Sequence, residues 1–339
     1  MATGSILIVR TSALGDVVQA LPVLTALRRH LPEARIGWVV EAAFAPLLRG
    51  LPALDEILEV RLRDWRRRPL SPRSWRQARE FLGRLDSFAP QVVLDLMGNH
   101  KAGLLAAVTL ADRRIGLGRS WRREPSSAVW LSEAVPAEGV HAVDRMLSVL
   151  AGLDLPRQAA EFGLDDLPDA SLPGELRDGP FAVVLPGAAW ANKRYPPDRW
   201  GEVARLLAAD PGLPTLVAAG PGEEELAAGV DAAAAGAALT LPVLGLAELA
   251  TLLRRATLVL GGDTGPLHLA HALGAPVCCV MGPTDPERHG PYGAPERVVV
   301  RRLPCSFCHQ RLEGVKACLW ELSPEEVAAR ARQILAGSG

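Results

Sequence analysis

Residues 258–292 read LVLGGDTGPLHLAHALGAPVCCVMGPTDPERHGPY and carry the clearest pattern in the chain. The first three residues are an apolar run bounded by glycine, which predicts a buried strand. Gly261–Gly265 follows as a tight polar loop, and Pro266 suits the first turn of a helix, where an amide donor is not needed. Gly274 predicts the end of that helix, and Val277–Met281 predicts the next strand. The stretch therefore predicts the order strand, glycine loop, helix, strand.

The glycine loop also predicts an anion site. Amide groups at the start of a helix lack partners within the helix, so they can bind a phosphate, and Thr264 and His268 would lie beside them. The alternative is an ordinary turn between strand and helix that Asp263 or Thr264 caps, and a single loop of this kind favours that alternative. The loop at 11–16 has the same character, and this second loop favours the phosphate site.

Strands and helices alternate along the rest of the chain as well. In residues 1–150 the apolar runs predict strands at 6–9, 36–40, 57–60, 92–94 and 115–117. A first helix is predicted from the opening loop to about His30, where Pro22 favours a kink or a late start. Further helices are predicted at 75–85, 101–110 and 142–150. In the second half, strands are predicted at 182–185 and 215–218, and helices at 200–208, 223–235, 246–254 and 324–335. This alternation predicts an α/β fold with two doubly wound, Rossmann-like domains.

A linker separates the two predicted domains. Residues 154–180 are rich in Asp, Pro and Gly, which favours an irregular connection. We expect an N-terminal domain at 1–160, a C-terminal domain at 175–322, and a last helix within 323–339 that packs back on the N-terminal domain. Ligands of such sheets bind at the carboxyl ends of the strands, so both domains are expected to face a central cleft.

The composition is that of a soluble protein with reduced thiols. Hydrophobic residues make up 49% of the 339 residues, yet no apolar run is long enough to cross a bilayer. The opening MATGSILIVR lacks the basic region and the apolar core of a secretion signal. Five cysteines, two of them adjacent in a predicted strand, do not form the pattern of a disulfide scaffold. We therefore expect a cytoplasmic protein.

Charge is distributed unevenly over a chain whose net charge is -1. Residues 1–150 hold 21 Lys and Arg against 15 Asp and Glu, and the remainder holds 16 against 23. Seven arginines lie in 61–76 together with two tryptophans, and a second basic cluster lies at 119–123. Such a run is usually a solvated surface, and no nucleic-acid-binding module accompanies it. The asymmetry favours a phosphate- and carboxylate-bearing partner or an anionic membrane surface on the N-terminal half.

Three further side chains are candidates for chemistry. Asp16 ends the first loop, where it can cap a helix or act as a general base that takes a proton from a hydroxyl group. Lys193 is one of only three lysines and follows a predicted strand, so it is either a surface charge or a phosphate ligand. Glu223 follows a Gly-Pro-Gly loop, where it can support a helix start or bind a ribose diol.

The sequence favours a site without a metal. Cys305, Cys308 and Cys318, with His309, have a spacing that is partly zinc-like, but the second half of a zinc motif is missing, so plain thiols are favoured. No Asp-x-Asp pair occurs in the chain. Without a divalent ion, a departing diphosphate has to be stabilised by helix N-termini and cations.

Several motifs together resemble a known family. They are ILIVRTSALGDVVQALPVL at 6–24, WVVE at 38–41, KRYPPDRW at 193–200 and GDTGPLHLAHALGAPVCCVMGPTDP at 262–286. In these motifs, and over nearly its whole length, the chain resembles the lipopolysaccharide heptosyltransferases of glycosyltransferase family 9. DWRRR at 64–68, REP at 123–125 and HAVDR at 141–145 resemble heptosyltransferase I in particular, which adds the first heptose to the Kdo region of lipid A.

The resemblance implies a fold, a reaction and a set of site residues. It implies the GT-B architecture, in which the N-terminal domain binds the acceptor and the C-terminal domain binds the donor. It also implies an ADP-heptose donor, a Kdo-lipid A acceptor, metal-independent inversion, no cofactor, and peripheral contact with the cytoplasmic face of the inner membrane. By the family pattern Asp16 is the base. The implied donor ligands are Lys193, which is also expected to act in catalysis, Glu223, Asp263, Thr264, Gly265 and His268. From the basic N-terminal half we expect the acceptor ligands to be Ser12, Arg63, Arg66, Arg67 and Arg123.

Two departures leave the acceptor open. Ala188 and Ala189 stand where heptosyltransferase I has hydroxyl residues, and the cysteine-bearing tail at 305–318 resembles heptosyltransferase II. The chain can therefore serve the first heptose step, the second one, or a family member's reaction with a different acceptor. A nucleotide-sugar epimerase and a non-catalytic nucleotide-sugar-binding protein are the alternatives outside this reaction. Asp16 favours catalysis, because a protein that only binds the donor needs no carboxylate facing an acceptor.

Overall fold

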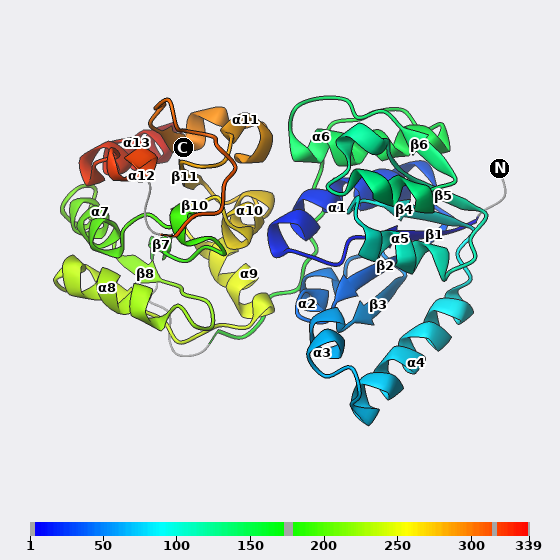
Figure 1. Cartoon of the computed structure of the whole chain (residues 1–339). Helices are drawn as coiled ribbons and strands as arrows, with labels where there is room; N and C mark the ends of the chain where they lie inside the picture. The colour runs from blue at the N-terminus through cyan, green and yellow to red at the C-terminus, as the bar shows by residue number, and fades with distance from the viewer. Residues whose placement is uncertain (1–3, 173–178, 314–316, 338–339) are drawn as a thin grey trace. The chain divides into compact units, whose positions relative to one another are not determined.

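The computed structural model describes residues 4–172, 179–313 and 317–337, which form two compact units divided between Pro168 and Asp169 (Figure 1). The division falls within the predicted linker at 154–180. The predicted start of the second domain, residue 175, lies outside the described residues, as do both ends of the chain.

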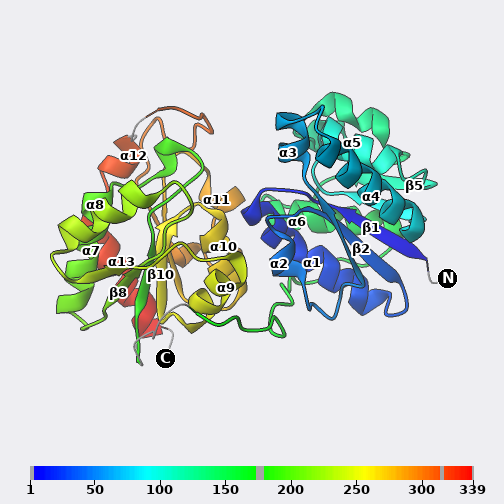
Figure 2. The same ribbon diagram turned by 90° about the horizontal axis from the view of Figure 1, so that it is seen from below.

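Within the described residues, the N-terminal unit is built on a six-stranded sheet with the order β3-β2-β1-β4-β5-β6, all pairs parallel. Its strands are β1 (Ser5–Val9), β2 (Arg35–Glu41), β3 (Glu56–Val60), β4 (Val92–Asp95), β5 (Arg113–Leu117) and β6 (Glu133–Val135). Its helices are α1 (Leu14–His30), α2 (Ala45–Leu48), α3 (Leu62–Arg67), α4 (Pro72–Phe88), α5 (His100–Ala107) and α6 (Ala142–Leu147), with 3-10 turns η1 (Arg119–Trp121), η2 (Pro125–Trp130) and η3 (Ser148–Leu153). Figure 2 shows α3, α4 and α5 on one side of this sheet and α1 and α2 on the other.

The C-terminal unit has the same design, with the sheet order β12-β11-β10-β7-β8-β9 and parallel pairs throughout the described part. Its strands are β7 (Ala182–Leu185), β8 (Thr215–Val217), β9 (Ala238–Thr240), β10 (Leu258–Gly262), β11 (Val277–Met281) and β12 (Val298–Val300). Its helices are α7 (Pro197–Ala209), α8 (Glu224–Ala234), α9 (Leu246–Arg255), α10 (Gly265–Ala272), α11 (Pro286–His289), α12 (Ala317–Trp320) and α13 (Pro324–Gly337), with 3-10 turns η4 (Ala191–Lys193) and η5 (Pro295–Arg297).

The strand orders show where each unit can form a ligand site. In the first sheet the chain runs outward from β1 to β3 and then returns to place β4 on the other side of β1. In the second sheet β7 has β8 on one side and β10 on the other. Loops that leave neighbouring strands in opposite directions open a crevice at the carboxyl edge of such a sheet. The loops after β1, β4, β7 and β10 are therefore the ones that can hold a site.

The α/β fold with two Rossmann-like domains is confirmed. The short strands β6, β9 and β12 were not predicted. Helix α1 begins at Leu14 and runs through Pro22, so the late start that Pro22 suggested is wrong. Pro22 is buried among apolar neighbours of the same helix, and this burial offsets the lost hydrogen bond.

Helix α13 packs within its own unit. Its contacts are with α7 and with strands β10, β11 and β12, and its side chains Val327, Ala331 and Ile334 join the core around Trp200. The expectation that the last helix packs back on the N-terminal domain stays a prediction. None of the helices in the described residues has the length and apolar character needed to cross a membrane.

Candidate active site

The carboxyl edge of the second sheet gathers three polar side chains around Asp263. Asp263 lies in the turn between β10 and α10, and its Oδ2 accepts hydrogen bonds from Lys193 Nζ at 2.5 Å and Thr284 Oγ1 at 2.7 Å. His268 Nε2 lies 3.0 Å from the other carboxylate oxygen. Lys193 follows β7 and Thr284 follows β11, and both strands flank β10. The order of the strands therefore assembles this cluster.

The electrostatics of the cluster favour an ionised carboxylate. Burial by itself would raise the pKa of Asp263, whose side chain is 9% exposed. The hydrogen bond from His268 and the positive charge of Lys193 outweigh burial and hold the pKa of Asp263 well below its usual range. Asp263 is thus a fixed negative charge that orients Lys193.

Lys193 is held in place and still has donors to spare. Its ammonium group bonds to Asp263 and lies 4.7 Å from the centre of the Trp190 ring, and its side chain is 16% exposed. An ammonium group has three N–H donors. The remaining donors can bind an anion at the carboxyl edge of the sheet.

The start of helix α10 lies beside the ion pair of Lys193 and Asp263. Thr264 is the N-cap residue, and its hydroxyl Oγ1 is buried without a hydrogen-bond partner in the described part of the chain. Gly265 is the first residue of the helix and Pro266, which lacks an amide proton, is the second. Amides in the first turn have no partner within the helix and favour negative charge. A buried, unpaired hydroxyl beside such amides fits a phosphate oxygen.

Glu223 follows the loop that leaves the neighbouring strand β8. Its Oε2 accepts a hydrogen bond from the amide of Gly220 at 2.8 Å, and it is the N-cap residue of α8. A Cβ atom on Gly187, which follows β7, would lie 1.9 Å from the same oxygen. Position 187 therefore has to be glycine, so that the carboxylate can lie across the loop after β7.

In the N-terminal unit, Asp16 is fixed at both carboxylate oxygens. It is the third residue of α1, and its Oδ2 accepts a hydrogen bond from the amide of Ala13 at 3.1 Å. Its Oδ1 lies 2.6 Å from Arg10 Nη2, and the side chain remains 46% exposed. The predicted capping role is correct in part: the Asp16 carboxylate bonds to the start of α1, but Ala13 and not Asp16 is the N-cap residue. The exposed part of the carboxylate is accessible to a hydroxyl group, as a general base requires.

Four of the expected acceptor ligands follow β1 and β3. Ser12 is half-buried in the loop between β1 and α1, while Arg63, Arg66 and Arg67 are exposed on α3. Glu41, at the end of β2, lies close to Arg63. Burial raises the pKa of Glu41, and a hydrogen bond from the backbone of Arg63 partly opposes this shift.

Arg123 is exposed between η1 and η2, next to a buried ion pair. Arg122 pairs with Asp95, and both side chains are at most 1% exposed. The amide of Glu124 donates to the carbonyl of Gly98 at 3.0 Å and ties this segment to the loop after β4. Arg122 was counted with the basic surface at 119–123, and that interpretation is wrong because its charge is neutralised in the interior. The pair holds Arg123 at the carboxyl edge of the first sheet.

The cysteines are separate from these clusters. Cys278 and Cys279 are buried in β11, and burial raises the pKa of the Cys278 thiol to about 12. Cys305 is exposed, Cys308 is half-buried and Cys318 is buried. Among the described residues, no group of three or more His, Cys, Asp or Glu side chains is arranged to hold a metal ion.

A family model described as glycosyltransferase family 9 (heptosyltransferase) matches residues 80–318. The chain belongs to this family. It is 34% identical to lipopolysaccharide heptosyltransferase 1 of Pseudomonas aeruginosa over 95% of this chain and 89% of that protein. It is 31% identical to lipopolysaccharide heptosyltransferase 1 of Escherichia coli over 86% of this chain and 92% of that protein.

Solved structures of the family share the fold of this member. The E. coli heptosyltransferase WaaC with ADP matches with a TM-score of 0.83 and 27% identity, over 97% of this chain and 99% of that one. The same enzyme with ADP-2-deoxy-2-fluoro heptose matches with a TM-score of 0.78 and 27% identity, over 99% and 100% of the two chains. The expected resemblance to the heptosyltransferases and to the GT-B fold is confirmed.

The structure also shows residues at the candidate site that were not predicted from the sequence. Thr284 and Trp190 contact Asp263 and Lys193, and Arg10 pairs with Asp16. Each lies in a segment that follows the carboxyl end of a strand: Arg10 after β1, Trp190 after β7 and Thr284 after β11. A position after a strand end was therefore the sequence feature that could have indicated these residues. It shows which side chains they contact only when the strand order is known.

Proposed function

We propose that this family 9 member is an inverting transferase that moves heptose from ADP-heptose to the Kdo region of lipid A, which is the first heptose step. The cluster of Lys193, Asp263 and Thr264 at the start of α10 carries the proposal. Family membership and the likeness to WaaC, which was solved with ADP, support it.

The donor end of the mechanism uses the second sheet. The donors of Lys193 that Asp263 leaves free, the Thr264 hydroxyl and the amide of Gly265 bind the diphosphate. They stabilise the negative charge that grows on it as its bond to the anomeric carbon breaks. Glu223 binds the ribose diol, since its carboxylate lies at the neighbouring strand end.

The acceptor end uses the first sheet. Asp16 takes the proton of the acceptor hydroxyl while that oxygen bonds to the anomeric carbon from the face opposite the diphosphate, so the configuration inverts. ADP leaves with the electron pair of the broken bond. Arg63, Arg66, Arg67 and Arg123 bind the carboxylates and phosphates of the acceptor, with Ser12 beside the base.

Two acceptors distinguish the first heptose step from the second. We expect the enzyme to add heptose to a Kdo-bearing lipid A that carries no heptose. Transfer only to an acceptor that already carries one heptose would assign the chain to the second step. ADP-heptose binding without transfer to either acceptor would make it a nucleotide-sugar-binding protein.

We expect turnover to be independent of divalent metal. Lys193 and the start of α10 supply the positive charge that a metal would otherwise bring to the diphosphate. The measurement compares rates with and without a strong chelator, followed by added magnesium or manganese. A rate that vanishes in chelator and returns with either metal would refute this prediction.

We also propose that one surface of the N-terminal unit docks on the anionic membrane that holds the acceptor. The surface, here the α4–α5 face, is formed by helices α3, α4, α5 and turn η2, of which the three helices lie on the same side of the sheet (Figure 2). It carries seven of the thirteen exposed large hydrophobic side chains in the described residues. They are Leu70, Trp75, Leu82, Leu104, Val108, Leu110 and Val129.

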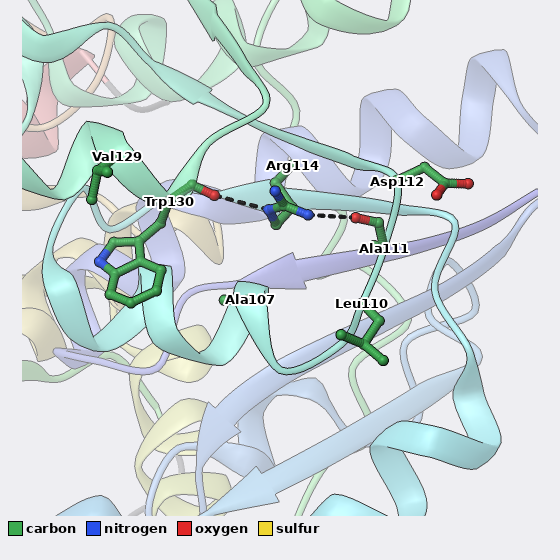
Figure 3. A pocket seen from close by; sticks show the side chains of 7 residues that line it. All are labelled: Ala107, Leu110, Ala111, Asp112, Arg114, Val129 and Trp130. Atoms are coloured by element: carbon green, nitrogen blue, oxygen red, sulfur yellow. Dashed lines mark hydrogen bonds between the residues drawn. The ribbon is translucent and has the colours of Figure 1, made fainter.

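The chemistry of the α4–α5 face fits a lipid surface. Leu110 is 87% and Val129 76% exposed, and both line an open pocket of about 480 Å³ at the amino end of β5 (Figure 3). The helices α3 and α4 of this face also carry exposed arginines, among them Arg66 and Arg76. Cations attract anionic headgroups, and apolar side chains enter the boundary below them.

The triple variant Arg63→Ala, Arg66→Ala and Arg67→Ala is expected to weaken use of the acceptor and binding to anionic vesicles. ADP affinity is expected to stay the same, because the donor ligands lie on the other sheet. Acceptor kinetics, vesicle sedimentation and ADP titration check this. An equal loss of ADP affinity would assign the arginines to the donor.

Leu110→Asp with Val129→Asp is expected to reduce binding to anionic vesicles while transfer to a detergent-dispersed acceptor continues. Leu239→Asp with Val243→Asp is the matched control, since these side chains are 56% and 47% exposed on the C-terminal unit. Equal vesicle binding by both double variants, or a changed oligomeric state in the first, would contradict docking on the membrane.

A further inference from the structure

We infer that Arg10 is the positioning residue of the candidate base, holding Asp16 in one orientation from within the first sheet. The inference deepens the proposed function and rests on it, because it concerns the carboxylate that takes the acceptor proton. The two residues meet at 2.6 Å between Arg10 Nη2 and Asp16 Oδ1.

Arg10 is anchored by the strands on either side of β1. It directly follows β1, and its carbonyl accepts a hydrogen bond from the indole of Trp38, a fully buried residue of β2, at 3.0 Å. Its Nη1 donates to the carbonyl of Leu96, which directly follows β4. The backbone of Arg10 is therefore held from β2, and its guanidinium is held from the residue that follows β4.

Asp16 depends on this anchor more than Arg10 depends on Asp16. The Arg10 side chain is 11% exposed, while the Asp16 side chain is 46% exposed. Of the carboxylates in the described residues, Asp16 is the one within ion-pair distance of Arg10. The buried cation and the amide of Ala13 each hold one oxygen of the carboxylate, so its orientation is set.

A base held in this way remains able to react. An ionised carboxylate offers about four lone-pair positions, of which Arg10 and Ala13 use two. Proton transfer requires the carboxylate to stay within hydrogen-bond reach of the hydroxyl. Since a misplacement of about 1 Å can cost about 10²-fold in rate, a fixed orientation matters for turnover.

A purely structural role is the alternative, and a second ion pair in the same unit provides the matched control. Arg28, on α1, pairs with Asp55 and also donates to the carbonyls of Ala53 and Pro32. It resembles Arg10 in combining a carboxylate with carbonyl anchors. It lies at the opposite end of α1 from Asp16.

The experiment measures kcat and KM for Arg10→Met, Arg10→Lys and Arg28→Met. Arg10→Met is expected to lower kcat by about 10–100-fold with an unchanged KM for ADP-heptose, because orientation and not donor binding is lost. Arg10→Lys is expected to recover most of this loss, since its ammonium can still hold one carboxylate oxygen. Arg28→Met is expected to keep the kcat of the unmodified enzyme.

Asp16→Asn separates this inference from the proposed function. If Arg10 acts through Asp16, adding Arg10→Met to Asp16→Asn should lower kcat little further. An equal kcat for Arg10→Met and Arg28→Met, or a full further loss in the double variant, would overturn the role of Arg10. Normal turnover of Asp16→Asn alone would instead overturn the assignment of the base. If Arg10→Met does not fold, Arg10→Gln replaces it, because its amide can still donate to the carbonyl of Leu96 but carries no positive charge. A kcat far below normal at a normal melting temperature then supports the inference, and a normal kcat overturns it.

Discussion

Asp16→Asn is expected to lower turnover by about 10²–10⁴-fold, the range that a lost general base costs. The asparagine oxygen can still accept the hydrogen bond from Ala13, but the amide cannot take up a proton from the acceptor. ADP affinity is expected to stay the same, because the donor ligands lie on the second sheet. Steady-state kinetics with ADP titration measure both quantities.

Stability separates this effect from damage to helix α1. Asp16→Asn loses a half-exposed ion pair with Arg10, which is worth about 0–1 kcal/mol. Asp16→Ala also loses the bond to Ala13 and is expected to cost about 1 kcal/mol more. Thermal unfolding of both variants checks this order. Near-normal turnover of Asp16→Asn would show that the carboxylate only caps the helix.

Lys193→Met is expected to lower turnover by about 10²–10³-fold, as the loss of one donor to a developing negative charge does. ADP affinity should fall as well, because the buried carboxylate of Asp263 would then face the diphosphate without its cation. Loss of one partner from a buried ion pair costs at most about 3–5 kcal/mol of stability. The cost here should lie below that range, because Thr284 and His268 still contact Asp263.

A double variant tests whether Lys193 acts on the donor or only on Asp263. Lys193→Met with Asp263→Asn removes both charges, so no unpaired carboxylate is left in the site. Stability is expected to recover relative to Lys193→Met, while turnover stays low. Recovery of turnover along with stability would show that the lysine serves only to neutralise Asp263.

The fold and part of the candidate site could be predicted from local sequence. Gly261–Gly265 and the loop ending at Asp16 follow apolar runs, and such runs indicate buried strands wherever they occur. Because a parallel sheet places all carboxyl ends at one edge, Lys193, Glu223 and Asp263 could be assigned to the edge of one sheet before any coordinates existed. The side chains that these residues contact could not be predicted in this way.

Partners depend on which strands are neighbours, and sequence does not give that order. Arg10 reaches Leu96 because β4 lies beside β1, and Thr284 reaches Asp263 because β11 lies beside β10. Arg122 was assigned to a basic surface because nothing local shows that Asp95 lies behind it. The packing of α13 against α7 shows the same limit, since its apolar face gave no information about which elements would bury it.

Mass spectrometry of the acceptor tests the central claim most directly. The enzyme is incubated with ADP-heptose and heptose-free Kdo-lipid A in the presence of a chelator, and the released ADP is counted alongside. The account predicts that the acceptor gains the mass of one heptose, with one ADP released for each. Consumption of ADP-heptose without a gain in acceptor mass, or binding without any release of ADP, would contradict it.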